Sequence, residues 1–387
     1  MKSSLSLFAQ IVQVIPRAKF ARVVRQTSAE RHSKGFTSWD QLVAMLFCQF
    51  AQSKSLREIS DGLAVTHGKL NHLGLRSAPA KSTLAYANAH RPWQMFELLL
   101  GELFSLCKSI SPGKKRKFRF KNPLMSLDAS IIELCVSMFP WAEFHHGKGA
   151  AKLHLLLDHD GYLPVFAHVT EGNCNELRIA QSLSLPKGSI VALDRAYIDY
   201  GLFQKWTDQG VFFVTRLKNK SLIKVVEERS VPAGSNALAD ALVKMTGQRV
   251  SKKCTCLMRI VVVWDERNCK IVTLLTNNLK LAASTIAAIY RDRWEIELFF
   301  KVLKQRLKIK TFVGTSLNAV KIQIWTALIT LLLIKYLQFK SKCAFPLCRL
   351  VALLRLNLFT YRDLWDWLAN PLAVPPLEPP PQLALAF

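Results

Sequence analysis

Apolar runs long enough to span a membrane are absent from this 387-residue sequence. In the C-terminal half, the longest apolar stretch without a charge covers residues 322–334, whereas a membrane-spanning helix needs about 20 residues. We therefore predict a buried helix over residues 319–339. The first 15 residues lack the small-residue cleavage site of a signal peptide, and Phe8, Ile11 and Ile15 recur at helical spacing. They predict an amphipathic first helix, and together these features predict a cytoplasmic protein.

A framework of paired cysteines is also missing. The nine cysteines are scattered and odd in number, which indicates reduced thiols. Cys254 and Cys256 form a single C-x-C motif with no second Cys or His pair nearby. Two residues on the same side of a strand are the favoured interpretation of this motif, and a zinc site is the alternative.

Acidic residues are few compared with basic ones. The chain has 27 Asp and Glu against 53 Lys and Arg, so its formal net charge at pH 7 is +26. Such a charge destabilises a compact chain by self-repulsion unless an anionic partner offsets it. Nucleic acid is the partner that this charge predicts, and an anionic membrane is the alternative. Residues 1–121 hold 20 Lys and Arg against 6 Asp and Glu, so more than half of the excess lies in the first third of the chain.

The basic N-terminal segment has the pattern of several short helices. Thr37 and Asp40 can form a capping box before an apolar run, and Ser55 with Glu58 can cap a second short helix. Ser82 is predicted to cap a third helix, which carries the side chains of Lys81, Tyr86, Asn88, His90 and Arg91. We predict an all-α, helix-turn-helix-like DNA-binding domain over residues 1–110, with Lys81 and Arg91 in contact with DNA. The alternative is a plain helical bundle with a solvated basic face.

The pattern changes from helices to strands near residue 124. Residues 111–122 form a basic linker in which Lys and Arg alternate with two Phe, a combination suited to a phosphate backbone. Strands and one short helix then alternate in the manner of a mixed α/β sheet. We divide the rest of the chain into an α/β domain over 123–340, with a β-rich insertion at about 218–282, and a C-terminal helical segment over 341–387 that ends in a proline-rich tail.

Two acids lie at positions where an ionised carboxylate is energetically unfavourable. Asp128 lies inside a predicted core strand, and Asp194 directly follows another, residues 189–193. An ionised carboxylate in such a place is unfavourable unless it is paired or binds a cation. Each acid considered alone has a plain alternative, which is an exposed position where the strand ends.

The predicted helix over 284–307 carries four polar side chains on one stripe. Tyr290, Arg293, Glu297 and Lys304 follow one another at intervals of three, four and seven residues. An acid flanked by a tyrosine and two cations is suited to a metal ion bound to a phosphate. The alternative is a surface helix in which Arg293 and Glu297 form an ordinary ion pair one turn apart.

These residues resemble a known family. The spacing Tyr290-x2-Arg293-x3-Glu297-x6-Lys304 is similar to the signature helix of the IS-four family of bacterial insertion-sequence transposases. Asp128 and the motif Asp194-Arg195-x-Tyr197 resemble the first two catalytic acids of that family. The stretches at 213–218 and 274–277 are also similar to family members, and the resemblance covers roughly residues 120–340.

The resemblance implies an RNase H-like catalytic core with a β-rich insertion. It implies cut-and-paste transposition, in which the terminal inverted repeats of an insertion sequence are bound, cut and joined to target DNA. Mg²⁺ or Mn²⁺ would be held by Asp128, Asp194 and Glu297, and the other three residues of the helix signature would contact DNA. A homodimer in the end complex and a nucleoid location are expected. The alternatives are a nuclease that cuts without joining, a catalytically inactive DNA-binding regulator and a peripheral membrane protein.

Other polar and aromatic residues have simpler interpretations. Trp264 could stack on a flipped base, but a core position at a strand end is favoured. Asp158 and Asp160 are explained by a hairpin turn, since an Asp-Gly pair follows. His154 and His168 are predicted to be cross-strand neighbours, with packing favoured over a zinc pair.

Overall fold

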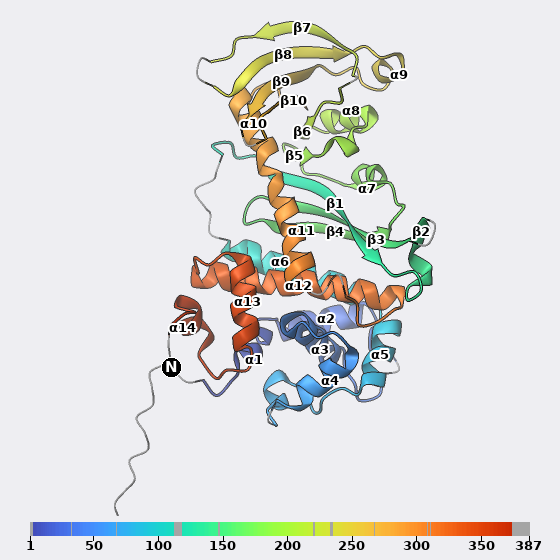
Figure 1. Ribbon diagram of the computed structural model, residues 1–387, viewed down its shortest axis with the longest axis vertical. Coiled ribbons are helices and arrows are strands. Elements are labelled where there is room, and N and C mark those ends of the chain that lie inside the picture. The colour runs from blue at the N-terminus through green and yellow to red at the C-terminus, as the bar shows by residue number, and fades with distance from the viewer. Residues whose placement is uncertain are drawn as a thin grey trace, which may run out of the picture.

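The protein has a layer of helices at one end and one large sheet at the other (Figure 1). The predicted basic linker and the proline-rich tail lie largely outside the described residues. The computed structural model describes residues 3–31, 33–66, 68–111, 118–145, 148–219, 221–232, 235–266, 268–307, 309 and 311–373.

The N-terminal region is helical, as its pattern predicts. The capping box of Thr37 and Asp40 is formed, and the side chain of Ser55 accepts from the backbone N–H of Glu58. The first helix is buried on nearly every side, including Phe8 and Ile11. The helices are α1 (Leu7–Val12), α2 (Arg17–Gln26), α3 (Ser38–Ala51), α4 (Leu56–Ala64), the 3-10 helix η1 (Leu70–Leu73), α5 (Lys81–His90) and α6 (Gln94–Ile110).

One detail of the predicted DNA-reading motif differs in the structure. The third helix begins at Lys81 after Ala80, which provides no side-chain cap, so the prediction that Ser82 caps it is wrong. Residues 65–80, which include η1, connect α4 to α5. The turn of a helix-turn-helix has only about three or four residues. This connection is longer than such a turn, and a helix-turn-helix-like arrangement stays a prediction.

The C-terminal helices pack against the N-terminal ones. The predicted buried helix is α12 (Leu317–Ser341), which contacts α3 and α6; α13 (Leu347–Asn357) and α14 (Leu364–Ala369) follow. α12 is long and apolar enough to cross a membrane, but 83% of its most apolar window is buried inside the protein. The Gln10 amide donates to the carbonyl of Arg362 and accepts from the N–H of Leu364, which joins the two ends of the described chain. Buried residues of both sets of helices belong to one hydrophobic core.

Within the described residues, ten strands form one sheet. Its order is β2-β3-β1-β5-β6-β10-β9-β8-β7, and β4 pairs with β3 beside β2. The strands are β1 (Leu124–Leu134), β2 (Glu143–His145), β3 (Lys148–Asp158), β4 (Leu163–Glu171), β5 (Ile190–Leu193), β6 (Phe212–Arg216), β7 (Ile223–Arg229), β8 (Ala237–Met245), β9 (Met258–Asp265) and β10 (Lys270–Thr276). The shorter helices between them are η2 (Pro140–Ala142), α7 (Glu176–Ser182), η3 (Arg195–Tyr197), α8 (Tyr200–Asp208) and α9 (Gln248–Ser251).

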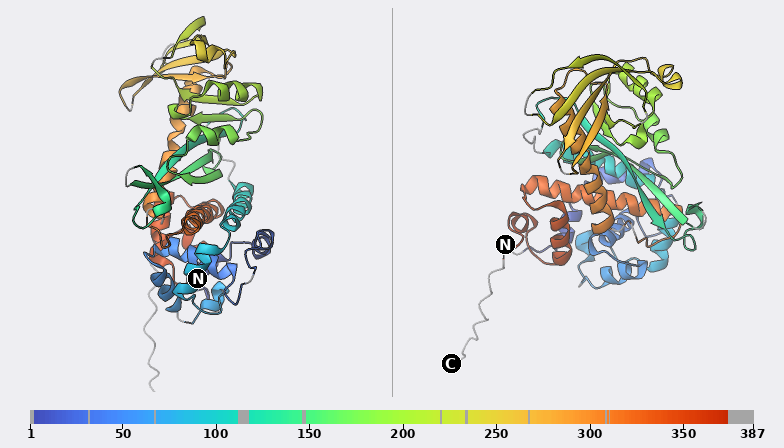
Figure 2. Two further views of the ribbon diagram at one scale, coloured as in Figure 1. Left: turned by 90° about the vertical axis from the view of Figure 1, so that its right-hand side faces the viewer. Right: turned by 45° about the horizontal axis from the view of Figure 1, so that its top comes forward.

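Strand directions divide the sheet into two halves. β3 runs antiparallel to β1 and β4, whereas β5 runs parallel to β1 and β6. The segment predicted to be β-rich, residues 218–282, contains β7 to β10, and β10 pairs antiparallel with β6. The β-rich segment therefore extends the mixed sheet rather than folding apart from it, and the views in Figure 2 agree.

The predicted helix over 284–307 is two helices. α10 (Ala283–Asp292) packs on β6, β8 and β9, while α11 (Trp294–Arg306) packs on β1 and α13. The interruption falls at Arg293, whose N–H lies 3.3 Å from the carbonyl oxygens of both Ile289 and Tyr290. The helix changes packing partners at this residue, and α11 crosses the face of the sheet at β1 (Figure 1).

Candidate active site

The sheet brings two of the three predicted acids together. β1 and β5 are parallel neighbours in which Leu127 is paired with Leu193. Asp128 is the next residue of β1, and Asp194 is the residue that directly follows β5, so both lie at the same level of the sheet. Asp194 also accepts a hydrogen bond of 2.7 Å from the N–H of Arg195 and so begins η3.

The third acid comes from the helix that crosses β1. Glu297 lies in the first turn of α11, and it lines an open cavity of about 400 Å³ together with Asp128. Lys301 and Lys304 line the same cavity. A carboxylate from β1, a carboxylate from α11 and two cations therefore share one depression on the surface.

Arg293 connects the acids of the strand and the helix. Its Nη2 lies 2.6 Å from Oε1 of Glu297, and its Nη1 lies 3.5 Å from Oδ2 of Asp128. The Arg293 side chain is only 11% exposed. The guanidinium thus supplies, at a nearly buried point, the positive charge that these two acids need.

The pKa of Asp128 reflects its burial and the charged groups around it. The pKa of Asp128 is raised from 3.8 to about 6, chiefly by burial and also by the carboxylates of Glu297 and Asp194. The N–H of Ala129 and the charge of Arg293 act in the opposite direction. Asp128 therefore senses both other acids, and its ionised form is held at a cost that a bound cation would lower.

The residues fit a divalent cation without already forming a closed site. Among the described residues, no group of three His, Cys, Asp or Glu is arranged around a common ligand position. Mg²⁺ keeps several of its waters and needs only one or two carboxylates directly, so it does not require such a cage. A half-buried, mutually repelling set of carboxylates is the kind of donor set that Mg²⁺ or Mn²⁺ prefers.

The remaining stripe residues lie on either side of Arg293, with Tyr290 near β6 and Lys304 on β1. The Arg293 guanidinium lies 5.6 Å from the ring centroid of Tyr290, whose hydroxyl is hydrogen-bonded to Arg216. Lys304 donates a hydrogen bond of 2.6 Å to the carbonyl of Ile131 in β1. Arg293 and Lys304 therefore contact β1, the strand that carries Asp128, whereas Tyr290 lies at the end of β6.

On α5, the predicted DNA contact Arg91 is used inside the protein. Its guanidinium donates to the carbonyl of Thr37 at 2.7 Å, to Oγ of Ser33 at 3.0 Å and to the carbonyl of Phe36. Asn88 is buried and accepts from the amide of Gln41. These contacts tie α5 to the start of α3.

Only part of the predicted DNA-reading set lies on the exposed face of α5. Lys81 is exposed at the first turn of α5, and Tyr86, 68% exposed, stacks on His90 with ring centroids 4.1 Å apart. Whether Lys81 and Arg91 contact DNA stays a prediction.

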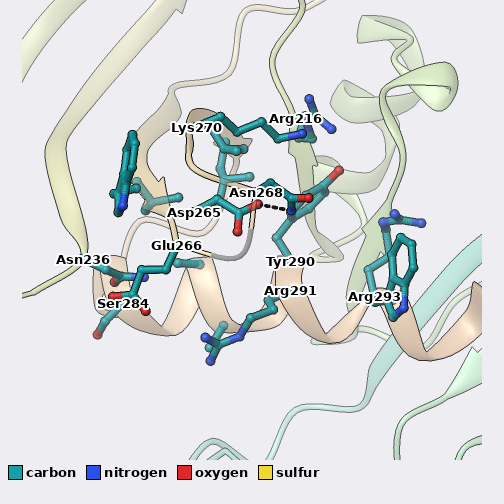
Figure 3. A pocket seen from close by; sticks show the side chains of 17 residues that line it. Arg216, Asn236, Asp265, Glu266, Asn268, Lys270, Ser284, Tyr290, Arg291 and Arg293 are labelled. Carbon is teal, nitrogen blue, oxygen red and sulfur yellow. Dashed lines mark hydrogen bonds between the residues drawn. The ribbon is translucent and has the colours of Figure 1, made fainter.

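A second cavity lies between the β9–β10 hairpin and α10. Its volume is about 810 Å³, and its lining includes Arg216, Tyr290 and Trp264 (Figure 3). Trp264 is 41% exposed, so the interpretation of it as a core residue is wrong. Trp264 lies next to the last residue of β9, and its side chain lines the cavity instead of packing in the protein interior.

The other predictions about isolated polar residues have clear outcomes. Asp158 and Asp160 both accept from Lys108 beside the β3–β4 turn. His154 is buried opposite His168, and burial lowers the pKa of His154 to about 4, in keeping with packing.

The cysteine pair is not in a strand. Cys254 and Cys256 precede β9, so that interpretation is wrong. Their Sγ atoms lie 3.2 Å apart in the loop that packs on α8, where Thr207 approaches Cys256.

Sequence reasoning did not single out Arg216 and Lys301. Arg216 lies at the end of β6 and contacts the hydroxyl of Tyr290, while Lys301 is one turn beyond Glu297 on α11. The spacing of Lys301 from Glu297 was a usable signal. Nothing local in the sequence indicates that Arg216 meets Tyr290.

Comparisons with known proteins agree with this geometry. A family described as transposase DDE domain matches residues 119–333, and a domain of unknown function matches residues 3–76. A protein of Sinorhizobium fredii named as a transposase is 31% identical over 74% of this chain and 80% of its own length. The transposase named for insertion sequence element IS5377 of Geobacillus stearothermophilus is 28% identical, over 67% of this chain and 68% of its own. The one named for IS4SA of Synechocystis is 26% identical, over 66% of this chain and 71% of its own.

A solved structure gives a weaker similarity. The piggyBac transposase synaptic complex with hairpin DNA covers 96% of this chain and 81% of its own at a TM-score of 0.43 and 11% identity. A TM-score this low does not establish a shared fold. The family match alone covers more than half of the sequence, and a transposase DDE domain implies an RNase H-like fold. The chain therefore belongs to the transposase DDE domain family of bacterial insertion sequences and is an enzyme of DNA transposition that catalyses strand cleavage and strand transfer.

Proposed function

We propose that Asp128, Asp194 and Glu297 are the catalytic carboxylates of this transposase. The observation that carries the proposal is the parallel register of β1 and β5, which sets Asp128 and Asp194 at one level of the sheet. Glu297 joins them because α11 crosses β1 and because Arg293 bridges Glu297 and Asp128. We assign no other acid of the described chain to this site.

The three carboxylates would hold Mg²⁺ or Mn²⁺. When bound, two such ions activate the attacking oxygen and stabilise the leaving oxygen of an in-line displacement at phosphorus. The protein's own part is to fix the carboxylates on the β1–β5 pair and on α11, with Arg293 between Asp128 and Glu297. Asp128 fits this role since a nearby cation removes the penalty that burial places on its ionised form.

The cations around the carboxylates would hold the DNA strand. Arg293 and Lys304 would bind phosphates beside the bond to be cut, and Tyr290 would support them through its hydroxyl. Arg293 must then exchange its carboxylate partners for a phosphate. This exchange is chemically matched, because a guanidinium recognises carboxylate and phosphate oxygens with the same planar set of donors.

The N-terminal helices would recognise the terminal inverted repeats. The charge of residues 1–121 supports a DNA-binding role, and Lys81 and Arg91 remain the proposed contacts, in a helix-turn-helix-like arrangement. We keep the division into a DNA-binding part (1–110), a basic linker (111–122), a catalytic part (123–340) with its β-rich insertion (218–282), and a C-terminal part. A homodimer would hold the two ends of the element together.

One assay tests the proposed function as a whole. The full chain is incubated with Mg²⁺ and a plasmid that carries the DNA found on both sides of its own reading frame. We expect cuts at the ends of the element and joining of the freed ends to a second plasmid, and no reaction after chelation of the metal. Cuts without joined products would contradict strand transfer by this site, and reaction in the chelated sample would contradict the metal.

A further inference from the structure

Two adjacent residues at the junction of α10 and α11 reach β1 by separate routes. Arg293 pairs with Asp128 directly. Asp292, the last residue of α10, reaches β1 through a histidine: its Oδ2 lies 2.6 Å from Nδ1 of His159. Nε2 of His159 lies 2.7 Å from Oγ of Ser126. Both routes therefore end on β1, two residues apart.

The chain of Ser126, His159 and Asp292 has the residue types of a hydrolytic triad but not its accessibility. Ser126 is fully buried, and the side chains of His159 and Asp292 are 6% and 2% exposed. No substrate can reach the serine hydroxyl in this enclosure, so nucleophilic attack is excluded. The three groups instead satisfy one another's polar atoms inside the protein, as buried polar groups must.

The geometry of β1 links this buried chain to the proposed active site. Ser126 and Asp128 are two residues apart on one strand, so their side chains leave the same face of the sheet. His159 is itself fixed, because its backbone N–H donates to the carbonyl of Leu124, at the start of β1, at 2.9 Å. A second bond, 3.4 Å from the hydroxyl of Tyr162 to Asp292, joins the β3–β4 turn to the same carboxylate.

A fully bonded buried network of this kind is rigid, because each member loses its partners if it moves. Asp292 directly precedes the one residue where the helix is interrupted, and Glu297 lies in the first turn after it. The network thus sets where α11 starts relative to β1. It follows that the separation of Glu297 from Asp128 depends on a cross-link that neither acid contacts.

We propose that Ser126, His159 and Asp292 are positioning residues, which hold α11 against β1 so that Glu297 and Asp128 bind metal together. This inference rests on the proposed function, since it assumes that those two acids are metal ligands. Side chains that orient metal ligands from outside typically change metal affinity or activity by about 10- to 100-fold when they are removed. Here the orientation acts through the backbone of β1 and α11.

The test uses the full chain with Mn²⁺ as the probe, alone and with end DNA. Ser126→Ala, His159→Gln and Asp292→Asn are compared by Mn²⁺ titration followed by electron paramagnetic resonance, by DNA affinity and by cleavage rate. We expect the Mn²⁺ dissociation constant to rise about tenfold in the His159 and Asp292 variants. Affinity for end DNA should stay within about twofold, because none of the three residues is placed on DNA. Ser126→Ala removes a single hydroxyl. If the other two variants fold poorly, the Mn²⁺ dissociation constant of Ser126→Ala tests the proposal in their place.

Asn277→Ala is the matched control. Asn277 is buried, and its amide bonds the N–H of Phe213, the carbonyl of Val211 and Thr207. Its loss should lower the melting temperature as much as Asp292→Asn does, yet leave the Mn²⁺ dissociation constant unchanged. In the double variant of His159→Gln and Asp292→Asn, the Mn²⁺ dissociation constant should rise by less than the product of the two single increases. Both substitutions break the same cross-link.

The outcomes distinguish failure of the proposed metal site from failure of the proposed positioning role. If Asp128→Asn leaves Mn²⁺ binding intact, the proposed metal site itself is wrong. If Asp128→Asn abolishes Mn²⁺ binding but the three network variants match Asn277→Ala, the network has only a structural role and the positioning inference is overturned.

Discussion

Arg293 forms ion pairs with Asp128 and Glu297 at the same time, and it does so at the one residue that interrupts the α10–α11 helix. The sequence pattern allows Arg293 two roles, as a phosphate contact or as the helical ion-pair partner of Glu297. In the structure the guanidinium pairs with the carboxylates. We propose that this side chain changes partner when DNA binds.

A salt series tests this change of partner. Replacing Arg293 or Lys304 with Ala should weaken binding to pre-cut end DNA and reduce the slope of log affinity against log salt by about 1 for each lost phosphate contact. The loss should be the same for all DNA sequences, because phosphate contacts carry no base information. Lys205→Ala, an exposed lysine on α8, is the control and should leave the slope unchanged. An unchanged slope for both Arg293→Ala and Lys304→Ala would make the stripe purely structural.

Asp128 should be a source of instability in the metal-free protein. Its pKa is raised to about 6 in the folded state from an ordinary 3.8, so the folded protein binds the proton more tightly than the unfolded chain. Stability from this group is therefore present at low pH and is lost as pH rises through about 6. Asp128→Asn should raise the free energy of unfolding at pH 8 by about 1 to 3 kcal/mol, and the gain should vanish near pH 3.

Chemical denaturation of both proteins at pH 3, 5 and 8, without divalent metal, measures that difference. Added Mn²⁺ should stabilise the wild type at pH 8 and leave Asp128→Asn unaffected. A variant less stable than the wild type at pH 8 would show that Asp128 is well paired by Arg293 and carries no penalty from burial.

Sequence recognition should depend on Lys81 more than on Arg91. The full chain should prefer DNA from the element's ends over scrambled DNA by at least ~10³ at physiological salt. Lys81→Ala should weaken binding with no change in melting temperature, since the side chain is exposed. Arg91→Ala should chiefly lower the melting temperature, because its guanidinium bonds three groups near the start of α3.

Binding experiments with two DNA duplexes and the three proteins check this. Equal affinity for end and scrambled DNA would reduce the N-terminal helices to a nonspecific basic surface. A large loss of end binding in Arg91→Ala at unchanged stability would contradict this ranking and make Arg91 as important a DNA contact as Lys81.

Local signals in the sequence predict the features that local chemistry decides. The capping box at Thr37, the hairpin turn after β3, the acid within β1 and the acid that follows β5 all follow from residue types at short spacing. The stripe that contains Glu297 follows from helical periodicity. Most of the candidate site can therefore be predicted from the sequence alone.

The features that were missed depend on distant partners. The helix breaks at Arg293 where its packing passes from the β6–β9 region to β1, and no Pro or Gly marks that point. The contact of His159 with Asp292 joins residues 133 positions apart. Trp264 is exposed because a cavity lies beside the end of β9. Periodicity cannot report such contacts, because they are fixed only when the sheet and the helices assemble.

Cleavage by single acid variants shows whether Asp128, Asp194 and Glu297 are the catalytic carboxylates. Asp128→Asn, Asp194→Asn and Glu297→Gln are compared with the wild type in Mg²⁺, on a duplex that carries one end of the element. Asp160→Asn is the control, because this acid is exposed and pairs with Lys108 beside the β3–β4 turn. The account predicts that each of the three variants binds the duplex as well as the wild type does but does not cut it, while Asp160→Asn cuts normally. Cleavage at a near wild-type rate by any one of the three would contradict the assignment of that acid.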